Sequence, residues 1–167
     1  MIRILIAYAT RAGSTRDVAG ILADEFRTLG CDVEVVDLAK VKPSVTDFHM
    51  VVVGSGINAG AWFSEAVAWV RTHARELSAM PVAVFNVCLN AADDSDGKRE
   101  ETLAYNDQVA VTLSPVASES FAGRYAPERV GWFQRVLLRT MQKSEQDHVD
   151  PARIRAWVQE LVASQVL

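Results

Sequence analysis

Two hydrophobic periodicities alternate along this chain of 167 residues. Short apolar runs rich in β-branched residues predict strands at residues 2–7, 32–36, 49–54, 82–87 and 116–122. Longer stretches with apolar positions at helical spacing predict helices at residues 14–29, 62–78, 97–113 and 151–163. The first, third and fourth strands are apolar throughout, which is typical of strands covered on both faces. The alternation therefore predicts the α/β class, with βαβ units on a parallel sheet and helices on both faces.

Two segments do not follow this alternation. Residues 38–46, which include Pro43, fit either a loop or a short crossover helix. Residues 125–150 exceed a plan of five βα units and predict an insertion. The remainder is of ordinary size for one hydrophobic core, so we expect a single domain over residues 1–167.

Composition narrows the class of protein. Half of the residues (50%) are apolar and 23% are charged, as in soluble globular proteins. The formal net charge of −4 argues against nucleic acid as the main partner. No apolar run has the length of a membrane span, and the N-terminal run is too short for a signal peptide. Cys31 and Cys88 fit neither a disulfide framework nor a metal site, so we expect a reduced, cytoplasmic setting.

The strongest local signal lies between the first strand and the first helix. A glycine and three hydroxyl side chains (Thr10, Gly13, Ser14 and Thr15) meet a helix N-terminus there. Free backbone N–H groups and the positive end of the helix dipole make such a turn an anion site. The spacing matches neither a triphosphate P-loop nor a dinucleotide-binding motif. The alternative is that Ser14 only caps the helix.

The same turn resembles the phosphate loop of the flavodoxin family. The residues that carry this resemblance, in order, are Tyr8, Thr10, Gly13, Thr15, Ala19 and Leu22. The resemblance implies a doubly wound sheet of five parallel strands in the order 2-1-3-4-5, and FMN as the cofactor. It also implies that backbone amides and hydroxyls hold the FMN phosphate, which assigns the loop residues Thr10, Arg11, Ala12, Gly13, Ser14 and Thr15 to the site.

A second glycine-rich loop follows the third predicted strand. In a sheet of this order, the ends of the first and third strands flank the crevice where the strand order reverses. We therefore expect the flavin ring to contact the loop residues Ser55, Gly56, Ile57, Asn58, Ala59 and Gly60. Trp62 follows this loop, where it either stacks on the ring or belongs to the core.

The loop after the fourth predicted strand completes the expected site. Its residues Leu89, Asn90 and Ala91 are expected to cover the ring from the other side. Asn90 either donates a hydrogen bond to the ring edge or only shapes a turn. The loop contains no aromatic residue, and the nearest one, Tyr105, is expected well within a helix.

Residues 132–143, within the insertion, have the pattern of an amphipathic helix with a basic stripe. Arg135, Arg139 and Lys143 recur at intervals of four residues beside an apolar face. Such a helix suits a peripheral contact with a membrane surface or an acidic partner. The alternative is an ordinary helix packed on the sheet, with solvated arginines.

The segment around the insertion resembles a narrower family, the menaquinone-dependent protoporphyrinogen oxidases. The motif Phe121-Ala122-Gly123, the following Arg124-Tyr125 and the basic apolar helix carry this resemblance. It implies an FMN oxidoreductase that passes electrons from a reduced tetrapyrrole to a quinone. The chain departs from that family at Asn58 and Ala59, where the family has a basic residue and an aromatic one.

Two other functions remain open at this point. One is a non-enzymatic flavodoxin that transfers electrons by docking redox protein partners. The other is an interaction module that no longer binds FMN. The spacing of the three histidines suggests no Ser-His-Asp or metal constellation, so we expect no catalytic side chain and no metal. FMN itself would carry the chemistry.

Overall fold

A parallel sheet forms the centre of the molecule in a computed structural model, which describes residues 1–125 and 146–164. Its parallel strands are β1 (Arg3–Ala9), β2 (Asp32–Asp37), β3 (Met50–Asn58), β5 (Val82–Cys88) and β6 (Ala117–Ala122). They lie in the order β2-β1-β3-β5-β6. Counted along the chain, this is the predicted order 2-1-3-4-5, so the doubly wound fold is confirmed. The sheet also has a short strand that was not predicted, β4 (Ala61–Trp62), which pairs antiparallel with the end of β3.

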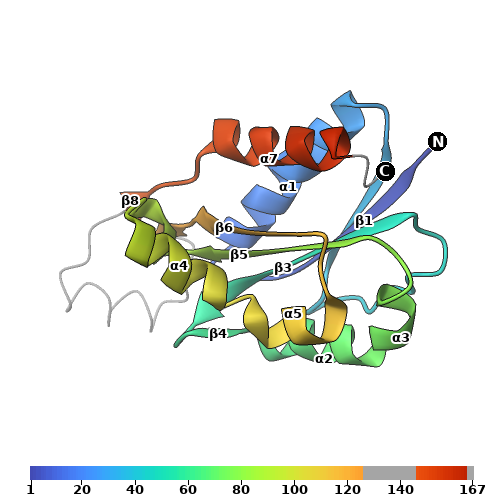
Figure 1. The fold of residues 1–167 in the computed structure, drawn as a ribbon, viewed down its shortest axis with the longest axis horizontal. Helices are drawn as coiled ribbons and strands as arrows, with labels where there is room; N and C mark the ends of the chain where they lie inside the picture. Colours follow the sequence, from blue (N-terminus) through green and yellow to red (C-terminus); the bar gives the residue numbers. More distant parts are fainter. Residues whose placement is uncertain (126–145, 165–167) are drawn as a thin grey trace.

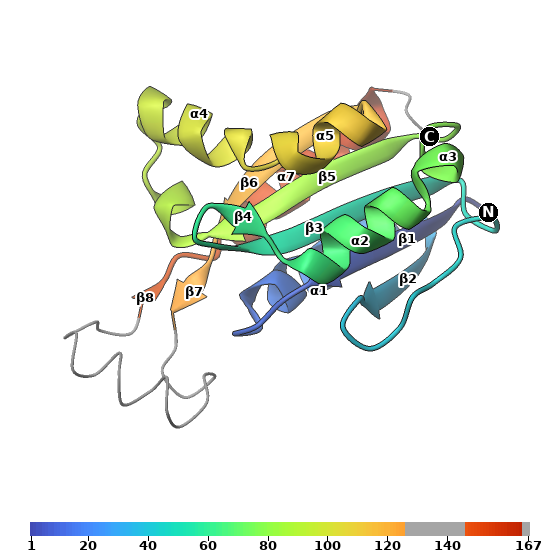
Figure 2. The same cartoon turned by 90° about the horizontal axis from the view of Figure 1, so that it is seen from below.

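Helices cover both faces of this sheet (Figures 1 and 2). On one face lie α1 (Ser14–Thr28) and α7 (Pro151–Ala163). On the other lie α2 (Ser64–Thr72), α3 (Ala74–Leu77) and α5 (Asp107–Leu113), with α4 (Asp96–Ala104) toward one end of the sheet. Two predicted helices are each divided, at His73 and at Tyr105–Asn106. Residues 38–46 form no helix, so of the two alternatives left open the loop is correct.

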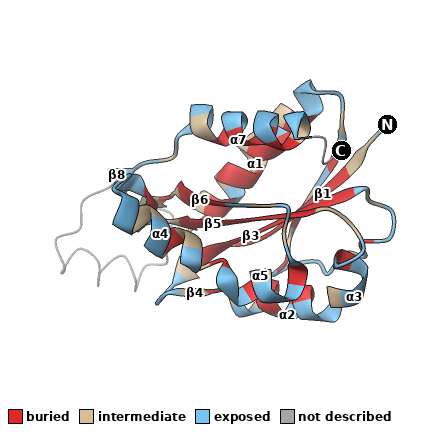
Figure 3. Ribbon diagram, viewed as in Figure 1, coloured by how far each residue is buried: buried red, intermediate tan, exposed pale blue. Residues whose placement is uncertain are grey.

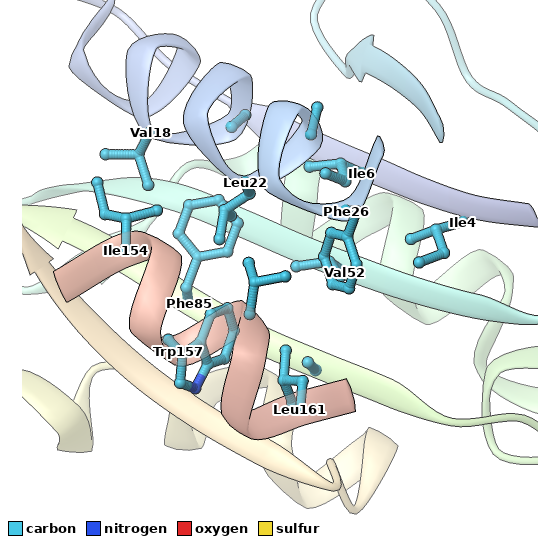
Figure 4. Packing of buried hydrophobic residues seen from close by; sticks show 14 of the residues in the cluster. Ile4, Ile6, Val18, Leu22, Phe26, Val52, Phe85, Ile154, Trp157 and Leu161 are labelled. Carbon is cyan, nitrogen blue, oxygen red and sulfur yellow. The ribbon is translucent and has the colours of Figure 1, made fainter. Parts of the chain in front are cut away.

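The apolar strands are buried because each contributes to two hydrophobic layers (Figure 3). Side chains alternate across a strand, and Val52 accordingly packs under α1 and α7 while Val51 and Val53 pack under α2 and α5. In the first layer, Phe26 of α1 and Trp157 of α7 lie over the sheet (Figure 4). Burial of the strands on both faces explains why they lack a polar alternation.

The loops predicted to form the site follow the carboxyl ends of the parallel strands. The third loop contains a short 3₁₀ helix, η1 (Leu89–Ala92). At the same end, β7 (Arg124–Tyr125) and β8 (Gln146–Asp147) form an antiparallel ribbon (Figure 2). The predicted insertion begins at this ribbon, and the helix predicted at residues 132–143 lies outside the described residues. None of the described helices has both the length and the apolar character required to cross a membrane.

Candidate functional site

The turn between β1 and α1 leaves the N-terminus of α1 open. The N-cap residue is Gly13, with φ of 94°, and among the described residues no side chain accepts a hydrogen bond from the first turn of the helix. Thr10 Oγ1 instead accepts from the Gly13 N–H at 3.0 Å, which folds the loop back on itself. Ser14 is the first residue of the helix, so the alternative that it caps the helix is wrong. The N–H groups of the first helical turn are therefore available to a ligand.

Thr15 adds a buried hydroxyl to this turn. Its exposed fraction is 1%, and its hydroxyl has no hydrogen-bond partner within residues 1–125 and 146–164. A Cβ at Gly56, at the end of β3, would lie 3.2 Å from Thr15 Oγ1 and 2.8 Å from the Phe63 ring. Glycine at position 56 therefore lets the second loop approach the first closely. A buried hydroxyl without a hydrogen-bond partner destabilises the folded protein unless a ligand supplies that partner.

The second loop is a tight hairpin. Asn58 pairs with Ala61, and the two residues between them, Ala59 and Gly60, have φ of 50° and 78°. Positive φ at both positions is what a two-residue type I′ hairpin requires. Ser55 and Gly56 are buried, Ile57 is half-buried, and the hairpin tip from Asn58 to Gly60 is exposed. The predicted contact residues of this loop thus divide into a buried base and an exposed tip.

Trp62 lies in the core of the second layer. Its exposed fraction is 3%, and its indole Nε1 donates to Asn106 Oδ1 at 3.2 Å. Its backbone N–H donates to Gln108 Oε1 at 2.9 Å. These contacts favour the core role that the sequence left open over a stacking role on the flavin.

A network of buried polar side chains joins Trp62 to the strands beneath the third loop. Asn106 accepts from Trp62 and from Asn86 Nδ2, and it donates to Ser118 Oγ and to the Glu119 carbonyl. Asn86 also donates to the Thr102 carbonyl and accepts from Ser120 Oγ. The sequence does not reveal this network, because isolated Asn residues carry no periodic signal.

The third loop is largely exposed, and Tyr105 lies between α4 and the second loop. Leu89 and Asn90 are exposed, whereas Ala91 is buried. Tyr105 was expected within a helix, but it lies just after α4, and its ring would be 3.8 Å from a Cβ at Gly60. Burial raises the pKa of the Tyr105 phenol, and so does its hydrogen bond to Glu101. Tyr105 therefore connects α4 with the hairpin tip.

Arg11 connects the first loop with the beginning of α2. Its guanidinium forms a bidentate ion pair with Glu65, in which Nη2 and Oε2 are 2.9 Å apart. The same group lies over the Phe63 ring, with Cζ 4.2 Å from the ring centroid. The hydrogen bond from Arg11 lowers the pKa of the Glu65 carboxyl to about 2, although burial partly opposes this shift.

The ribbon at the base of the insertion is joined to α1 by Arg124. This residue forms ion pairs with Asp17 of α1 at 3.2 Å and with Asp147 of β8 at 2.8 Å. A Cβ at the preceding Gly123 would lie 3.3 Å from Ser14 Oγ. The Gly123 segment therefore lies beside the first turn of α1. The described residues contain no group of three or more His, Cys, Asp or Glu side chains able to hold a metal.

Comparisons with known proteins agree with this architecture. A family model described as a flavodoxin domain matches residues 5–152. Protoporphyrinogen IX dehydrogenase (quinone) of Escherichia coli (strain K12) is 27% identical over 151 residues, which cover 89% of this chain and 83% of that protein. The protein of the same name from Leishmania major is 32% identical over 148 residues, covering 84% of this chain and 62% of that protein. The solved structure of oxidised flavodoxin 1 from Bacillus cereus has a TM-score of 0.63 at 14% identity, covering 96% of this chain and 97% of that one.

Proposed function

The chain belongs to the flavodoxin domain family, and we propose that it is an FMN-binding oxidoreductase that oxidises a protoporphyrinogen-type tetrapyrrole with a quinone as electron acceptor. Membership of the family supports a flavin cofactor. The finer assignment of substrate and acceptor draws on the two relatives named protoporphyrinogen IX dehydrogenase (quinone).

The hydroxyl of Thr15, which has no hydrogen-bond partner among the described residues, is the observation that carries the cofactor proposal. It is buried at the open N-terminus of α1, where uncapped N–H groups favour an anion. A phosphate monoester supplies the acceptor oxygens that both the hydroxyl and the amides lack. The residues present therefore fit the phosphate of FMN, and Thr10, Gly13, Ser14 and Thr15 would hold it.

The flavin ring is proposed to lie between the second and third loops. The exposed segment from Asn58 to Gly60 offers backbone groups from one side, and Leu89 and Asn90 offer contacts from the other. FMN supplies the electron transfer when bound, while the protein binds and orients it. We assign no catalytic side chain, because a bound flavin would carry the redox chemistry itself.

Titration of the apoprotein tests the cofactor proposal. FMN is expected to bind more tightly than riboflavin, because the phosphate loop contributes hydrogen bonds that riboflavin cannot make. Isothermal titration calorimetry with both ligands gives the two dissociation constants. Equal affinity for FMN and riboflavin would contradict a phosphate site at α1.

Turnover under anaerobic conditions tests the substrate proposal. The FMN-loaded protein is expected to convert protoporphyrinogen to protoporphyrin only when a menaquinone analogue is added, with the porphyrin measured by its fluorescence. A protein that binds FMN but shows no quinone-dependent turnover would instead be an electron-transfer flavodoxin. Reduction of its flavin by a redox protein partner would then be the relevant activity.

A further inference from the structure

Arg11 links three parts of the proposed site that are far apart in the sequence. Its Nη1 donates to the carbonyl of Thr10 at 3.1 Å, within the phosphate loop. The same nitrogen and Nη2 donate to the two carboxylate oxygens of Glu65, 54 residues along the chain. The planar group also packs on the Phe63 ring. Arg11 therefore joins the first loop to the beginning of α2.

The contacts continue from α2 into the second loop. The Phe63 N–H donates to Ser55 Oγ at 2.9 Å, and Ser55 Oγ donates to the Gly56 carbonyl at 2.7 Å. Gly56 is also the residue next to Thr15 Oγ1, which has no hydrogen-bond partner within residues 1–125 and 146–164. A continuous path of contacts thus runs from Thr10 through Arg11, Phe63 and Ser55 back to Thr15.

The charge of Arg11 is already balanced within this path. Glu65 has 15% of its side chain exposed and accepts hydrogen bonds from both Nη1 and Nη2 of Arg11. Its carboxylate therefore competes with any external anion for these donors. A phosphate that took the same two nitrogens of Arg11 would have to displace the Glu65 carboxylate. Bidentate pairing and stacking together favour a fixed side chain.

We propose that Arg11 is a positioning residue for FMN, which holds the phosphate loop against α2 and the second loop. In this proposal Arg11 does not itself bind the FMN phosphate. This inference rests on the proposed FMN site. It predicts that Arg11 and Glu65 act as one unit. Removing either residue breaks the contacts between the phosphate loop and α2. The phosphate loop must then become ordered when FMN binds, which weakens binding.

The test compares dissociation constants for FMN and riboflavin across Arg11→Gln, Glu65→Gln and the double variant. Each single variant is expected to weaken FMN about tenfold, and the double variant no further, as for two residues that form one interaction. The ratio of riboflavin to FMN dissociation constants is expected to fall, because riboflavin does not use the phosphate loop. A general loss of structure would leave that ratio unchanged.

Two further variants distinguish a positioning role of Arg11 from direct binding of the phosphate. Arg11→Lys keeps the charge but loses the planar fork, so it is expected to weaken FMN nearly as much as Arg11→Gln. Arg71→Gln removes an exposed positive charge from the other end of α2 and is expected to leave FMN binding unchanged. Tighter FMN binding by Glu65→Gln, or full affinity in Arg11→Lys, would overturn the proposal. Failure of the wild-type protein to bind FMN would instead contradict the proposed function.

Discussion

Two regions of the molecule differ in whether their buried polar groups have hydrogen-bond partners: the first turn of α1, and the network of Asn86 and Asn106 beneath the third loop. At α1, the hydroxyl of Thr15 is buried without a hydrogen-bond partner in the described parts of the chain, and no side chain caps the helix. Beneath the third loop, Asn106 makes four side-chain hydrogen bonds and Asn86 makes three. Both regions lie near the carboxyl ends of the strands.

This difference distinguishes a binding surface from a scaffold. A protein that saturates its buried polar groups with its own side chains gains rigidity and has nothing to offer a ligand. Groups left without a partner cost stability in the free protein, and a ligand that completes them recovers that cost on binding. We therefore expect variants in the first region to alter FMN affinity and variants in the second to alter folding.

Replacing Asn106 by Leu tests the scaffold and has the largest expected effect. The change keeps the volume but leaves the Trp62 indole N–H without an acceptor and removes one partner each from Asn86 and Ser118. The free energy of unfolding is expected to fall by about 3–5 kcal/mol, as several buried polar groups lose partners. Urea unfolding measures this loss. Asn58→Ala, at the exposed hairpin tip, serves as the control and is expected to change it by about 0.5 kcal/mol or less. A loss below about 1 kcal/mol in Asn106→Leu would show that the network does not stabilise the fold.

Replacing Thr15 by Val tests the binding surface. The change removes a hydroxyl while preserving shape, so FMN is expected to bind about 10–100-fold more weakly, the scale of a lost hydrogen bond to a charged group. The apoprotein is expected to be at least as stable as wild type, because it loses no hydrogen bond. Thr102→Val is the matched control, since Thr102 is equally buried but donates to the Arg99 carbonyl. It should reduce stability without changing FMN affinity. If Thr15→Val binds FMN as tightly as wild type, the hydroxyl is not part of the site.

Replacing Trp62 by Phe tests whether this residue stabilises the core or contacts the flavin. We expect a loss of about 1–2 kcal/mol in the free energy of unfolding, from one hydrogen bond and some buried area. The absorption spectrum and affinity of bound FMN should not change. Trp157→Phe is the control, because the Trp157 indole has no hydrogen-bond partner in the described segments, and its loss should be smaller. A shifted flavin spectrum in Trp62→Phe would place the indole against the ring.

Acid titration of the Arg11–Glu65 pair gives the smallest expected effect. The pKa of Glu65 lies near 2 in the folded protein, below its usual value of 4.5, so the ionised carboxylate stabilises the fold. That contribution is complete above the unfolded pKa and is lost as the pH falls toward the folded one. The stability difference between wild type and Glu65→Gln should therefore be constant above about pH 5 and shrink as the pH falls from 4.5 toward 2. In an Arg11→Gln background, this pH dependence should largely disappear. A difference that does not vary with pH would mean that the pair contributes nothing to stability.

The hydrophobic pattern by itself determined the five parallel strands, and the glycine and hydroxyl residues after the first strand determined where a phosphate loop is proposed. Strands buried on both faces must be apolar, and a run of such residues is visible without any knowledge of contacts. The candidate anion site at Thr10–Thr15 was equally visible, because such a site at a helix N-terminus is built from residues that are close in sequence. The helix boundaries of α1 and α7 followed from the same local patterns.

Only the tertiary structure decided which of the predicted site residues pair with distant parts of the protein. The indole of Trp62 lies in the core because Asn106, 44 residues away, accepts its N–H. Arg11 pairs with Glu65 because α2 brings that carboxylate within hydrogen-bonding distance. The division of one predicted helix at Tyr105–Asn106 likewise accompanies the buried hydrogen bonds of Asn106. Each outcome depends on a partner distant in the sequence, and periodicity carries no information about such partners.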